Sequence, residues 1–508
     1  MQSLDEAVGI ISLAKGYDLT RNSPAWTDDE KKLVENDLFR LTASTLLTFN
    51  QDINNHQTWY NAGLMAIASV LGDAEMVEKV LTMRGGFHDQ LERSIGADGL
   101  WYEGSMAYHG YALQAMREIV DAGRRMGLPL QNEPKFRAMI EGPLRATYPN
   151  GVFPAINDSD PISISIFNDA FEWAWKTYRE PIFAQAAAWK NPAKLAELLG
   201  PDAKSQWPLS AHSENLSGAG LAILRQGEGE ATTNIFLDYG QHGGDNGGHG
   251  HFDKLNITLF ANGREWLLDP GRLSYSHKEY KTWVKQSAAH NTVTLGGASQ
   301  QATTGKLLFL QQGKNFSACA TQSDGAYPGS MLTRHLFLTD KMLVDVYDVV
   351  ADKETQIDWF AHSIAPVLQR IDAKTEGAEA TPGTENGYQH LTNALSWQTD
   401  GNTQWDFVSD ADNPAAPRLR LWLAGKTPEE VFTAVGIGYN TGQKAPTLIR
   451  RRNAKTTRFV TVYDLSGDAK YVWGVRAEKS IKVATSDGDW NIEFNKKGAK
   501  GILSPLKP

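Results

Sequence analysis

Apolar residues recur at every third or fourth position through most of the first 200 residues. This spacing places them on one face of an α-helix and predicts a series of helices separated by Gly-rich and Asp-containing breaks. The predicted helices span residues 1–14, 28–49, 58–71, 74–95, 103–125 and 162–178. Because the connections are short, successive helices should pair antiparallel, and several such pairs can form an incomplete α/α toroid.

The pattern changes after a stretch rich in Pro, Ser and Gly at 200–218. Short β-type runs follow, separated by Gly and Asn turns, and Asn262-Gly263 is the strongest hairpin signal among them. Antiparallel sheets in a large sandwich are therefore expected. The expected strands are 221–225, 234–239, 255–260, 266–269, 292–295, 306–311, 336–338, 342–350 and 357–361 and, after a polar stretch at 373–401, also 419–423, 458–463, 471–475 and 490–494.

The two patterns together predict an α+β multidomain protein. A chain of 508 residues is too long for one ordinary core, which agrees with several domains. The expected parts are an α/α toroid domain at 1–205, an antiparallel β-sandwich domain at 206–395 and a smaller C-terminal β domain at 396–508.

The composition limits the classes of partner that are expected for this protein. The formal net charge is −9, so the chain has no global positive field, and nucleic acid is not an expected partner. No run approaches the roughly 20 apolar residues of a membrane span, and no basic segment followed by an apolar run opens the sequence. The single cysteine, Cys319, excludes an intrachain disulfide. The 15 Trp and 16 Tyr suit sugar faces, although most such rings fill cores.

A first cluster of candidate functional residues lies at 54–60, where a predicted helix begins. Asn54 or Asn55 can cap this helix, because an Asn side chain accepts a hydrogen bond from the first free N–H groups. His56 has no such structural explanation, and Trp59 and Tyr60 flank it. His56 is therefore a candidate catalytic residue.

A second cluster lies at 98–111, where a Gly-containing loop leads into a helix that carries Tyr108 and His109 in its first turns. Glu103 can act as a first-turn charge that the helix dipole favours. The tyrosines of this segment can equally be core residues.

The third cluster, at 241–253, combines unusual glycine density with His242, His249 and His251. Glycine lets the backbone approach a ligand closely or turn sharply. In an extended segment residues i and i+2 share a face, so His249 and His251 can point into one site. Asp269 and His290 follow in the same β region and are possible further metal ligands. The hairpin at Asn262-Gly263 would place Asp269 opposite residue 256, so a bend or bulge is needed to bring it to His251.

In this order, the motifs resemble the heparinase II/III-like polysaccharide lyases, a group that includes heparin and heparan sulfate lyases and related alginate and oligoalginate lyases. The resemblance rests on Asn-His ahead of a helical Trp and on Asp-Gly-x-x-x-Glu-Gly-Ser-x-x-Tyr-His, Gly-His-Gly-His-Phe-Asp, Leu-Asp-Pro-Gly and Ala-His-Asn-Thr-Val, at 55–59, 98–109, 248–253, 268–271 and 289–293. The motifs that resemble the family lie within 50–293. The remaining β half resembles it only in its general pattern of short β-type runs. Family members usually have more helices ahead of these motifs, so 1–200 would be a shortened toroid.

The resemblance implies cleavage of a uronate-containing glycan by β-elimination, with alginate, heparin and heparan sulfate as candidate substrates. Asn55 and His249 would contact the uronate carboxylate, and His56 and Tyr108 would transfer protons. Where the departing proton and leaving group share a face of the sugar, Tyr108 could serve as both base and acid. In the opposite arrangement His56 would be the base and Tyr108 the acid.

The resemblance also implies a structural zinc held by His251, Asp269 and His290. Further candidate substrate contacts are Trp59, Glu103 and Tyr275. The expected partner is an acidic polysaccharide or oligosaccharide, and the expected location is periplasmic or secreted. The oligomeric state does not follow from the sequence.

The main alternative is a glycoside hydrolase on an α/α toroid, which needs two carboxyl groups flanking the scissile bond. Asp98, Glu103 and Asp158 are candidates for that pair. This interpretation leaves the His-Gly cluster at 241–253 unexplained.

Two further alternatives come from different classes of protein. A non-catalytic glycan-binding protein would keep its affinity for the glycan without His56 or Tyr108. A zinc-dependent hydrolase would use His249, His251 and Asp269 and would need an open metal position.

Overall fold

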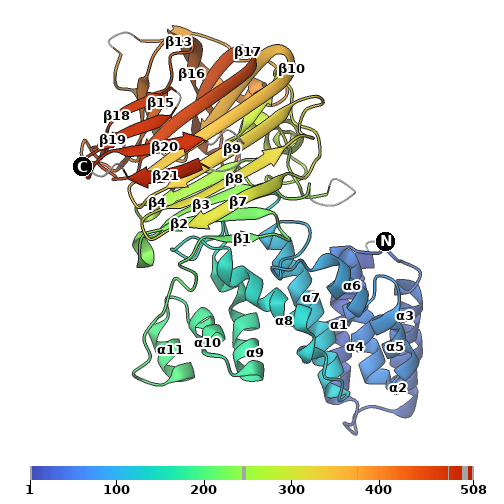
Figure 1. Ribbon diagram of the computed structural model, residues 1–508. Helices are drawn as coiled ribbons and strands as arrows, with labels where there is room; N and C mark the ends of the chain where they lie inside the picture. The colour runs from blue at the N-terminus through green and yellow to red at the C-terminus, as the bar shows by residue number, and fades with distance from the viewer. Residues whose placement is uncertain (1–2, 243–247, 374–375, 479, 495–500, 506–508) are drawn as a thin grey trace. The chain divides into compact units, whose positions relative to one another are not determined.

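The protein is described by a computed structural model that covers residues 3–242, 248–373, 376–478, 480–494 and 501–505 (Figure 1). The chain divides into two compact units, and each is described by itself. We call them the helical unit, which comprises Met1–Tyr102, Met106–Arg145 and Ile166–Ala187, and the β unit, which comprises Glu103–Ser105, Ala146–Ser165 and Ala188–Pro508. The expected mixture of helices and antiparallel sheets is confirmed.

The first 200 residues are mainly helical, as the apolar spacing predicts. The α-helices are α1 Ser3–Thr20, α2 Asp28–Leu33, α3 Leu41–Leu46, α4 Asn55–Leu71, α5 Ala74–Thr82, α6 Phe87–Ser94, α7 Met106–Arg125, α8 Pro134–Glu141, α9 Asn168–Tyr178, α10 Pro181–Ala187 and α11 Pro192–Leu199. Shorter 3-10 and π segments are η1 Val34–Arg40, η2 Leu130–Asn132, η3 Gly142–Arg145, η4 Ile164–Phe167, η5 Gly229–Ala231, η6 Tyr280–Val284, η7 Ser287–Ala289 and η8 Tyr388–His390.

Helix α4 forms the centre of the helical unit, and both α1 and α7 pack against it. Nearly all of its residues are buried, because apolar and small side chains occur on every face. At Gly63 a Cβ would lie 3.0 Å from the carbonyl oxygen of Ala7, so the missing side chain allows α1 and α4 to approach closely. Gly72, with φ of 67°, ends the helix in the left-handed conformation.

The single helix predicted over 74–95 is wrong, because the chain forms two helices there. Helix α5 ends at Thr82, and α6 begins at Phe87. Gly85 lies between them with φ of 74°, and a Cβ at this position would approach the carbonyl oxygen of Asp52 to 2.9 Å. The turn therefore depends on a residue without a side chain, and it interrupts an otherwise helical apolar pattern.

The strands of the β unit begin after the Pro- and Gly-rich stretch at 200–218. They are β1 Glu214–Leu216, β2 Leu221–Gln226, β3 Thr233–Asp238, β4 Ile257–Ala261, β5 Arg264–Leu267, β6 Val293–Leu295, β7 Lys306–Gln312, β8 Ser317–Ser323, β9 Met331–Leu338, β10 Met342–His362, β11 Val367–Arg370, β12 Ala378–Glu379, β13 Thr392–Thr399, β14 Thr403–Val408, β15 Arg418–Ala424, β16 Glu429–Ile437, β17 Lys444–Asp464, β18 Val472–Ala477, β19 Ile481–Thr485, β20 Trp490–Phe494 and β21 Gly501–Pro505.

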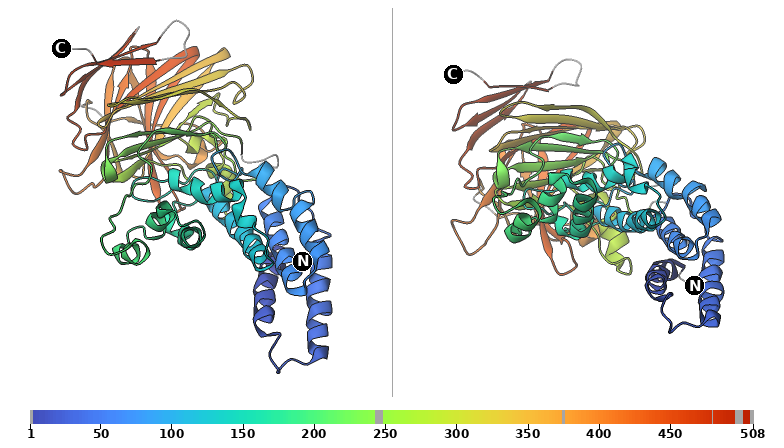
Figure 2. Two further views of the ribbon diagram at one scale, coloured as in Figure 1. Left: turned by 60° about the horizontal axis from the view of Figure 1, so that its bottom comes forward. Right: turned by 90° about the horizontal axis from the view of Figure 1, so that it is seen from below.

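In the described residues these strands form three antiparallel sheets. The first has five strands in the order β1-β2-β3-β4-β5, and the last has four in the order β18-β19-β20-β21. Between them in the sequence, a sheet of twelve strands contains the path β11-β14-β15-β17-β10-β9-β8-β7. The two views of Figure 2 show β18–β21 as a layer on the large sheet.

The large sheet is buried on both faces, as two adjacent residues of β10 show. Leu343 belongs to a core that it shares with Leu224 and Leu259 of the five-stranded sheet. Its neighbour Val344 belongs to a second core, together with Val475 of the four-stranded sheet. Successive side chains of a strand point to opposite faces, so burial on both faces explains why this segment is continuously apolar.

The prediction of separate strands at 342–350 and 357–361 is wrong. Both belong to β10, which continues through a register shift between Val350 and Thr355 against β17. The exposed charged residues at 352–354 lie within this shift, and in the sequence they are typical of a turn. The bulge allows one strand to carry such residues while both of its ends stay paired.

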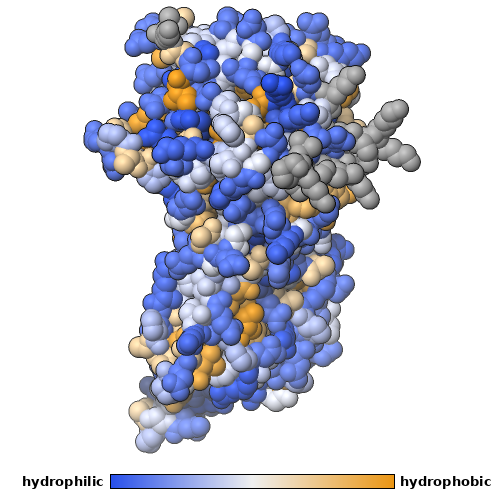
Figure 3. All heavy atoms as spheres, turned by 60° about the vertical axis from the view of Figure 1, so that its left-hand side comes forward, coloured by the Kyte–Doolittle hydropathy of each residue, from blue (hydrophilic) through white to orange (hydrophobic). Residues whose placement is uncertain are grey.

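The division into three domains at residues 205 and 395 stays a prediction, as does the toroid. Strands of the large sheet come from both sides of residue 395. None of the helices in the described residues is long and apolar enough to cross a membrane. The face shown in Figure 3 is mainly hydrophilic, with small scattered apolar patches.

Candidate active site and metal centre

Helix α4 positions the first pair of predicted site residues in the helical unit. Asn54 is the N-cap, and its side chain accepts a hydrogen bond from the backbone N–H of His56 at 2.8 Å. Asn55 is the first residue of the helix and not its cap, and it is 4% exposed. His56 follows it and is partly exposed.

Helix α7 of the same unit carries Tyr108 in its first turn, where the side chain is partly exposed. The next residue, His109, is buried; its Nδ1 accepts from the N–H of Trp101, and its Nε2 donates to the carbonyl oxygen of Met139 at 2.9 Å. Burial lowers the pKa of His109 to about 4. His109 is thus a neutral structural histidine.

Trp59 was predicted to contact substrate, but its side chain is only 3% exposed. Its ring packs on Tyr111 with centroids 5.1 Å apart. This position supports a packing role inside the helical unit.

In the β unit, a buried carboxylate organises the histidine motif. Asp158 lies in the segment between Ala146 and Ser165 and is fully buried. His249 Nδ1 donates to its Oδ2 at 2.9 Å, and His251 Nε2 donates to its Oδ1 at 3.0 Å. The backbone supports this pairing, because the Asp158 N–H donates to the carbonyl oxygen of His249. One carboxylate therefore holds both histidines of the His-x-His pair.

Three more side chains place hydrogen-bond donors near Oδ2 of Asp158. The buried Tyr280 hydroxyl donates at 2.6 Å, the Tyr275 hydroxyl lies at 3.4 Å, and Lys285 Nζ lies at 3.5 Å. Burial raises the pKa of Asp158, but the hydrogen bonds from His249 and His251 outweigh it and hold the pKa well below its usual range. Asp158 is consequently an ionised, buried acceptor.

His249 also faces a second acid of the β unit. Its Nε2 lies 3.7 Å from Oε1 of Glu103, which is 4% exposed. The hydroxyl of Tyr275 lies 3.3 Å from His249 Nδ1, and the Tyr275 side chain is 47% exposed. The structure thus brings three predicted site residues together: His249, Glu103 and Tyr275. Residues 243–247 of the Gly-rich segment lie outside the described residues.

A second cluster of buried groups lies directly behind His251. His251, Asp253, Asp269 and His290 each offer a ligand atom, and these atoms lie within 4.8 Å of one another. All four residues are fully buried. The three residues expected to hold a metal therefore lie together, and Asp253 joins them.

The donor set fits a metal ion. His251 Nε2 is bonded to Asp158 and His290 Nε2 donates to the carbonyl oxygen of Val284, so both Nδ1 atoms are turned toward the cluster. His251 Nδ1 and both carboxylate oxygens of Asp253 are buried without a hydrogen-bond partner in the described residues. Two imidazoles and two carboxylates are ligands that zinc accepts. Burial lowers the pKa of His290, but Asp269 and Asp253 outweigh it and raise the pKa to about 9, so the cluster attracts positive charge.

The bend that the sequence requires lies at residues 253–256. Asn256 Nδ2 donates to Asp269 Oδ2 at 2.7 Å, which is the pairing that the hairpin predicts. Leu255 has φ of 63°, and its left-handed conformation turns the preceding chain away from β4. The turn brings His251 and Asp253 toward Asp269, across a distance that an extended strand could not close.

The sequence of the β unit fits a known family. The family described as "Heparinase II/III-like, C-terminal" matches residues 208–482, which is more than half of the chain. The chain belongs to the heparinase II/III-like family of polysaccharide lyases. The family described as "Alginate lyase" matches residues 3–149.

Two relatives of this lyase align over almost its whole length. The exo-oligoalginate lyase of Saccharophagus degradans is 27% identical over 99% of this chain and 76% of the relative. The alginate lyase of Stenotrophomonas maltophilia is 26% identical over 96% of this chain and 72% of the relative. The heparin-sulfate lyase of Pedobacter heparinus is 24% identical over 51% of this chain and 38% of the relative.

Solved structures show that the lyase has a known fold. A crystal structure of heparinase III matches with a TM-score of 0.70 and 17% identity over 99% of this chain and 75% of that chain. The heparan sulfate lyase of Pedobacter heparinus matches with a TM-score of 0.67 and 18% identity over 100% of this chain and 75% of that chain.

Sequence reasoning missed four residues of this lyase's β-unit cluster. Asp158 was considered only as a hydrolase carboxylate, and Asp253, Tyr280 and Lys285 were not considered. Asp253 had a signal, because it ends the Gly-His-Gly-His-Phe-Asp motif at the same i+2 spacing as the histidines. The other three are linked to His249 and His251 only through tertiary contacts.

Proposed function

We propose that this lyase cleaves alginate-type oligouronates by β-elimination and leaves an unsaturated uronate end. The extent of the alignments supports alginate as the substrate. The two alginate-lyase relatives match nearly the whole chain, whereas the heparin-sulfate lyases match about half of it. The helical residues 3–149 match the alginate lyase family as well.

The chemistry explains why these residue types are needed. The C5 proton of a uronate is weakly acidic, so the charge of its carboxylate must be offset while an enolate-like intermediate develops. Asn55 and His249 supply hydrogen-bond donors for that carboxylate, and such preorganised donors are usually the largest catalytic term. A base then removes the C5 proton, and an acid protonates the departing O4 oxygen, each worth about 10²–10⁴-fold.

The identity of the base depends on the epimer that is cleaved. Tyr108 acts as both base and acid where the C5 proton and the O4 leaving group lie on the same face of the sugar. His56 is the base and Tyr108 the acid where they lie on opposite faces. Both side chains are partly exposed, as proton transfer to a bound sugar requires.

Asp158 is the positioning residue of this reaction. It contacts the substrate-binding residue His249 with one carboxylate oxygen and the metal-cluster residue His251 with the other. The hydrogen bond to Nδ1 sets the orientation of the His249 ring, so its Nε2 edge is presented to the substrate. Glu103 and Tyr275 flank that ring and are the adjacent substrate contacts.

The cluster of His251, Asp253, Asp269 and His290 is proposed to hold a structural zinc. When bound, the ion would supply folding free energy and fix the His249–His251 segment. Among the described residues, His251 Nδ1 and the Asp253 oxygens are buried without a hydrogen-bond partner, which supports this role because a buried polar atom without a hydrogen bond is costly. We also infer a shortened α/α toroid for the helical unit and a periplasmic or secreted location, on the strength of the family.

The function is tested by ultraviolet absorbance of the unsaturated product with polymannuronate, polyguluronate, mixed alginate oligosaccharides, heparin and heparan sulfate. Absorbance should rise with at least one of the alginate substrates, and Tyr108→Phe should lower the rate at least about 100-fold. Tyr111→Phe, one helical turn away on α7, is the matched control and should change the rate less than about threefold.

Two other outcomes would point to different functions. New reducing ends without the absorbance would replace the lyase by a hydrolase. Absorbance with heparin or heparan sulfate alone would keep the lyase and overturn alginate as its substrate.

A further inference from the structure

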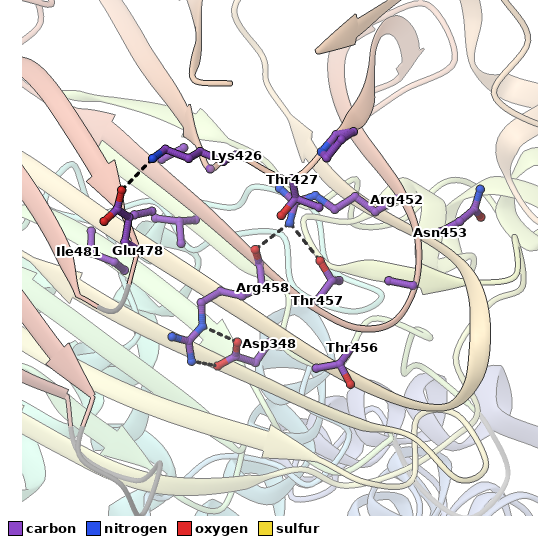
Figure 4. Close-up of a pocket in the computed structure, with 16 residues that line it drawn as sticks. Asp348, Lys426, Thr427, Arg452, Asn453, Thr456, Thr457, Arg458, Glu478 and Ile481 are labelled. Atoms are coloured by element: carbon purple, nitrogen blue, oxygen red, sulfur yellow. Dashed lines mark hydrogen bonds and ion pairs between the residues drawn. The ribbon is translucent and has the colours of Figure 1, made fainter. Parts of the chain in front are cut away.

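The β unit contains a hollow away from the histidine motif, and its described lining includes none of the proposed site residues (Figure 4). It is a groove of about 490 Å³ between three segments. These are the β15–β16 connection at 424–428, the part of β17 at 452–460 and, at β18 and β19, Ala477, Glu478 and Ile481. The groove is large enough for one or two sugar residues.

The wall of this groove rests on two arginines that share one carboxylate. Arg450 Nε donates to Glu429 Oε1 at 3.0 Å, and Arg452 Nε donates to Glu429 Oε2 at 2.8 Å. Arg450, Arg452 and Glu429 are 0%, 4% and 5% exposed. Both guanidinium groups also lie over the ring of Phe459, at 5.2 and 4.5 Å. The three ionised side chains together carry one surplus positive charge, which is costly to bury without a counter-charge.

Arg452 brings this surplus charge to the groove. Its Nη1 donates to the hydroxyl of Thr457 at 3.0 Å and to the carbonyl oxygen of Arg458 at 2.8 Å, as Figure 4 shows. Its Nη2 lies 2.8 Å from Glu429 Oε2, and it would lie 3.6 Å from a Cβ added at Gly425. Burial and the neighbouring charge of Arg450 lower the pKa of Arg452 to about 10. Glu429 is thus not enough to balance both arginines.

Each of the other charged side chains in the groove lining forms an ion pair with one side chain of opposite charge. Arg458 forms a two-bond ion pair with Asp348, and Lys426 pairs with Glu478 at 2.9 Å. These pairs leave the surplus of one positive charge unchanged. Thr427, Thr456 and Asn453 add hydroxyl and amide groups to the lining, and Figure 4 shows them around the same hollow as Arg452.

We propose that this groove is a second glycan site, which binds one uronate residue through its carboxylate at Arg452 and through its hydroxyls at the threonines and Asn453. A single surplus charge matches a monocarboxylated sugar better than a doubly charged sulfate or phosphate ion. The assignment of a uronate rests on the proposed function, because the site would hold a remote part of the same glycan. Such a site raises the residence time of a long chain without new chemistry.

The site is tested by calorimetric titration of the full chain with sodium trimannuronate in a Tyr108→Phe background. Two binding events are expected. Arg452→Gln, which leaves Arg450 and Glu429 as a matched pair, should weaken one event at least about tenfold and leave the other unchanged. Lys426→Ala should weaken the same event. Lys455→Ala removes an equal charge from an exposed position outside the described lining, and it should change neither event.

The variants also separate binding from folding. Because Arg452→Gln removes the surplus buried charge and leaves Glu429 paired with Arg450, its thermal midpoint without ligand should equal or exceed that of the parent. If Arg452→Gln fails to fold, the comparison of Lys426→Ala with Lys455→Ala decides the question, since both positions are exposed.

Three results would overturn the proposal. One is a single binding event in the parent and in every variant, and another is a second event that neither Arg452→Gln nor Lys426→Ala weakens. The third is sodium sulfate binding as tightly as trimannuronate, which would make the groove a general anion site. The titration needs no turnover, so a failure of the lyase assay with the unaltered protein overturns the catalytic function independently of the groove.

Discussion

Asp158 and His249 are joined by a hydrogen bond of 2.9 Å between Oδ2 and Nδ1, although 91 positions separate them in the sequence. The other oxygen of the same carboxylate binds His251, a residue of the metal cluster. The proposed substrate contact and the proposed metal centre therefore share a single buried anion. A change at the metal cluster has a direct path to the orientation of the His249 ring.

Asp158→Asn should lower kcat/KM about 100-fold while the protein still folds. The amide keeps the size of the carboxylate, but its NH2 group opposes one of the two histidine N–H donors, so His249 and His251 cannot both stay in place. Asp160→Asn is the matched control, because Asp160 is partly exposed, is paired with Arg272, and loses the same charge. Steady-state kinetics and zinc content should be measured on both. A kcat/KM of Asp158→Asn within threefold of the parent would show that His249 is held by other contacts.

Tyr280→Phe should mainly lower the free energy of unfolding, whereas Tyr275→Phe should mainly raise KM. The buried Tyr280 hydroxyl donates to Asp158 at 2.6 Å, and a lost hydrogen bond to a charged group costs about 1.5–3 kcal/mol of the free energy of unfolding. The Tyr275 hydroxyl is 3.4 Å from the same oxygen and its side chain is 47% exposed, so Tyr275→Phe should cost less than about 0.5 kcal/mol. Tyr275→Phe should instead raise KM. Urea unfolding and steady-state kinetics on the two variants test this contrast.

The metal cluster could largely be predicted from the sequence, for a reason that its residues make clear. His251, Asp269 and His290 lie in short motifs of one β region, which made them candidate ligands, whereas the turn at Leu255 that brings them together was expected only as an unspecified bend. Asp158 could not be found in this way. It comes from a segment without a helix or strand, and its partners His249 and Tyr280 are 91 and 122 positions away.

The long strand β17 shows which part of the fold could not be predicted from the sequence. Its first half was not predicted, because three consecutive arginines, Arg450 to Arg452, are typical of an exposed segment. In the structure each has an acid across the sheet: Arg451 pairs with Asp358, and the other two pair with Glu429. These partners lie on other strands, so the burial of the arginines depends on the complete sheet.

Removal of the metal should lower stability at least as much as activity. Prolonged treatment with a chelator should lower the thermal midpoint, since the buried carboxylates of Asp253 and Asp269 would then lose their counter-ion. Zinc should restore the midpoint, and magnesium should not, because His251 and His290 supply nitrogen ligands. Asp253→Asn should lower the affinity for zinc about 10–100-fold, as metal titration followed by calorimetry can show. A midpoint that chelation leaves unchanged while activity falls would favour a catalytic metal.

Glu265 should make the protein less stable as the pH rises from 4.5 to about 7. Burial raises its pKa from 4.5 to about 7, more than the hydrogen bonds from Tyr439 and Tyr148 lower it. The folded protein therefore binds a proton more strongly than the unfolded chain does, so this contribution is complete below pH 4.5 and is lost as the pH passes 7. Glu265→Gln cannot ionise and keeps a hydrogen-bonding side chain between the two tyrosines. Its free energy of unfolding, measured in urea at pH 5, 6, 7 and 8, should fall less with pH than that of the parent. Equal slopes for the two proteins would mean that the carboxyl of Glu265 ionises at its ordinary pKa in the folded state.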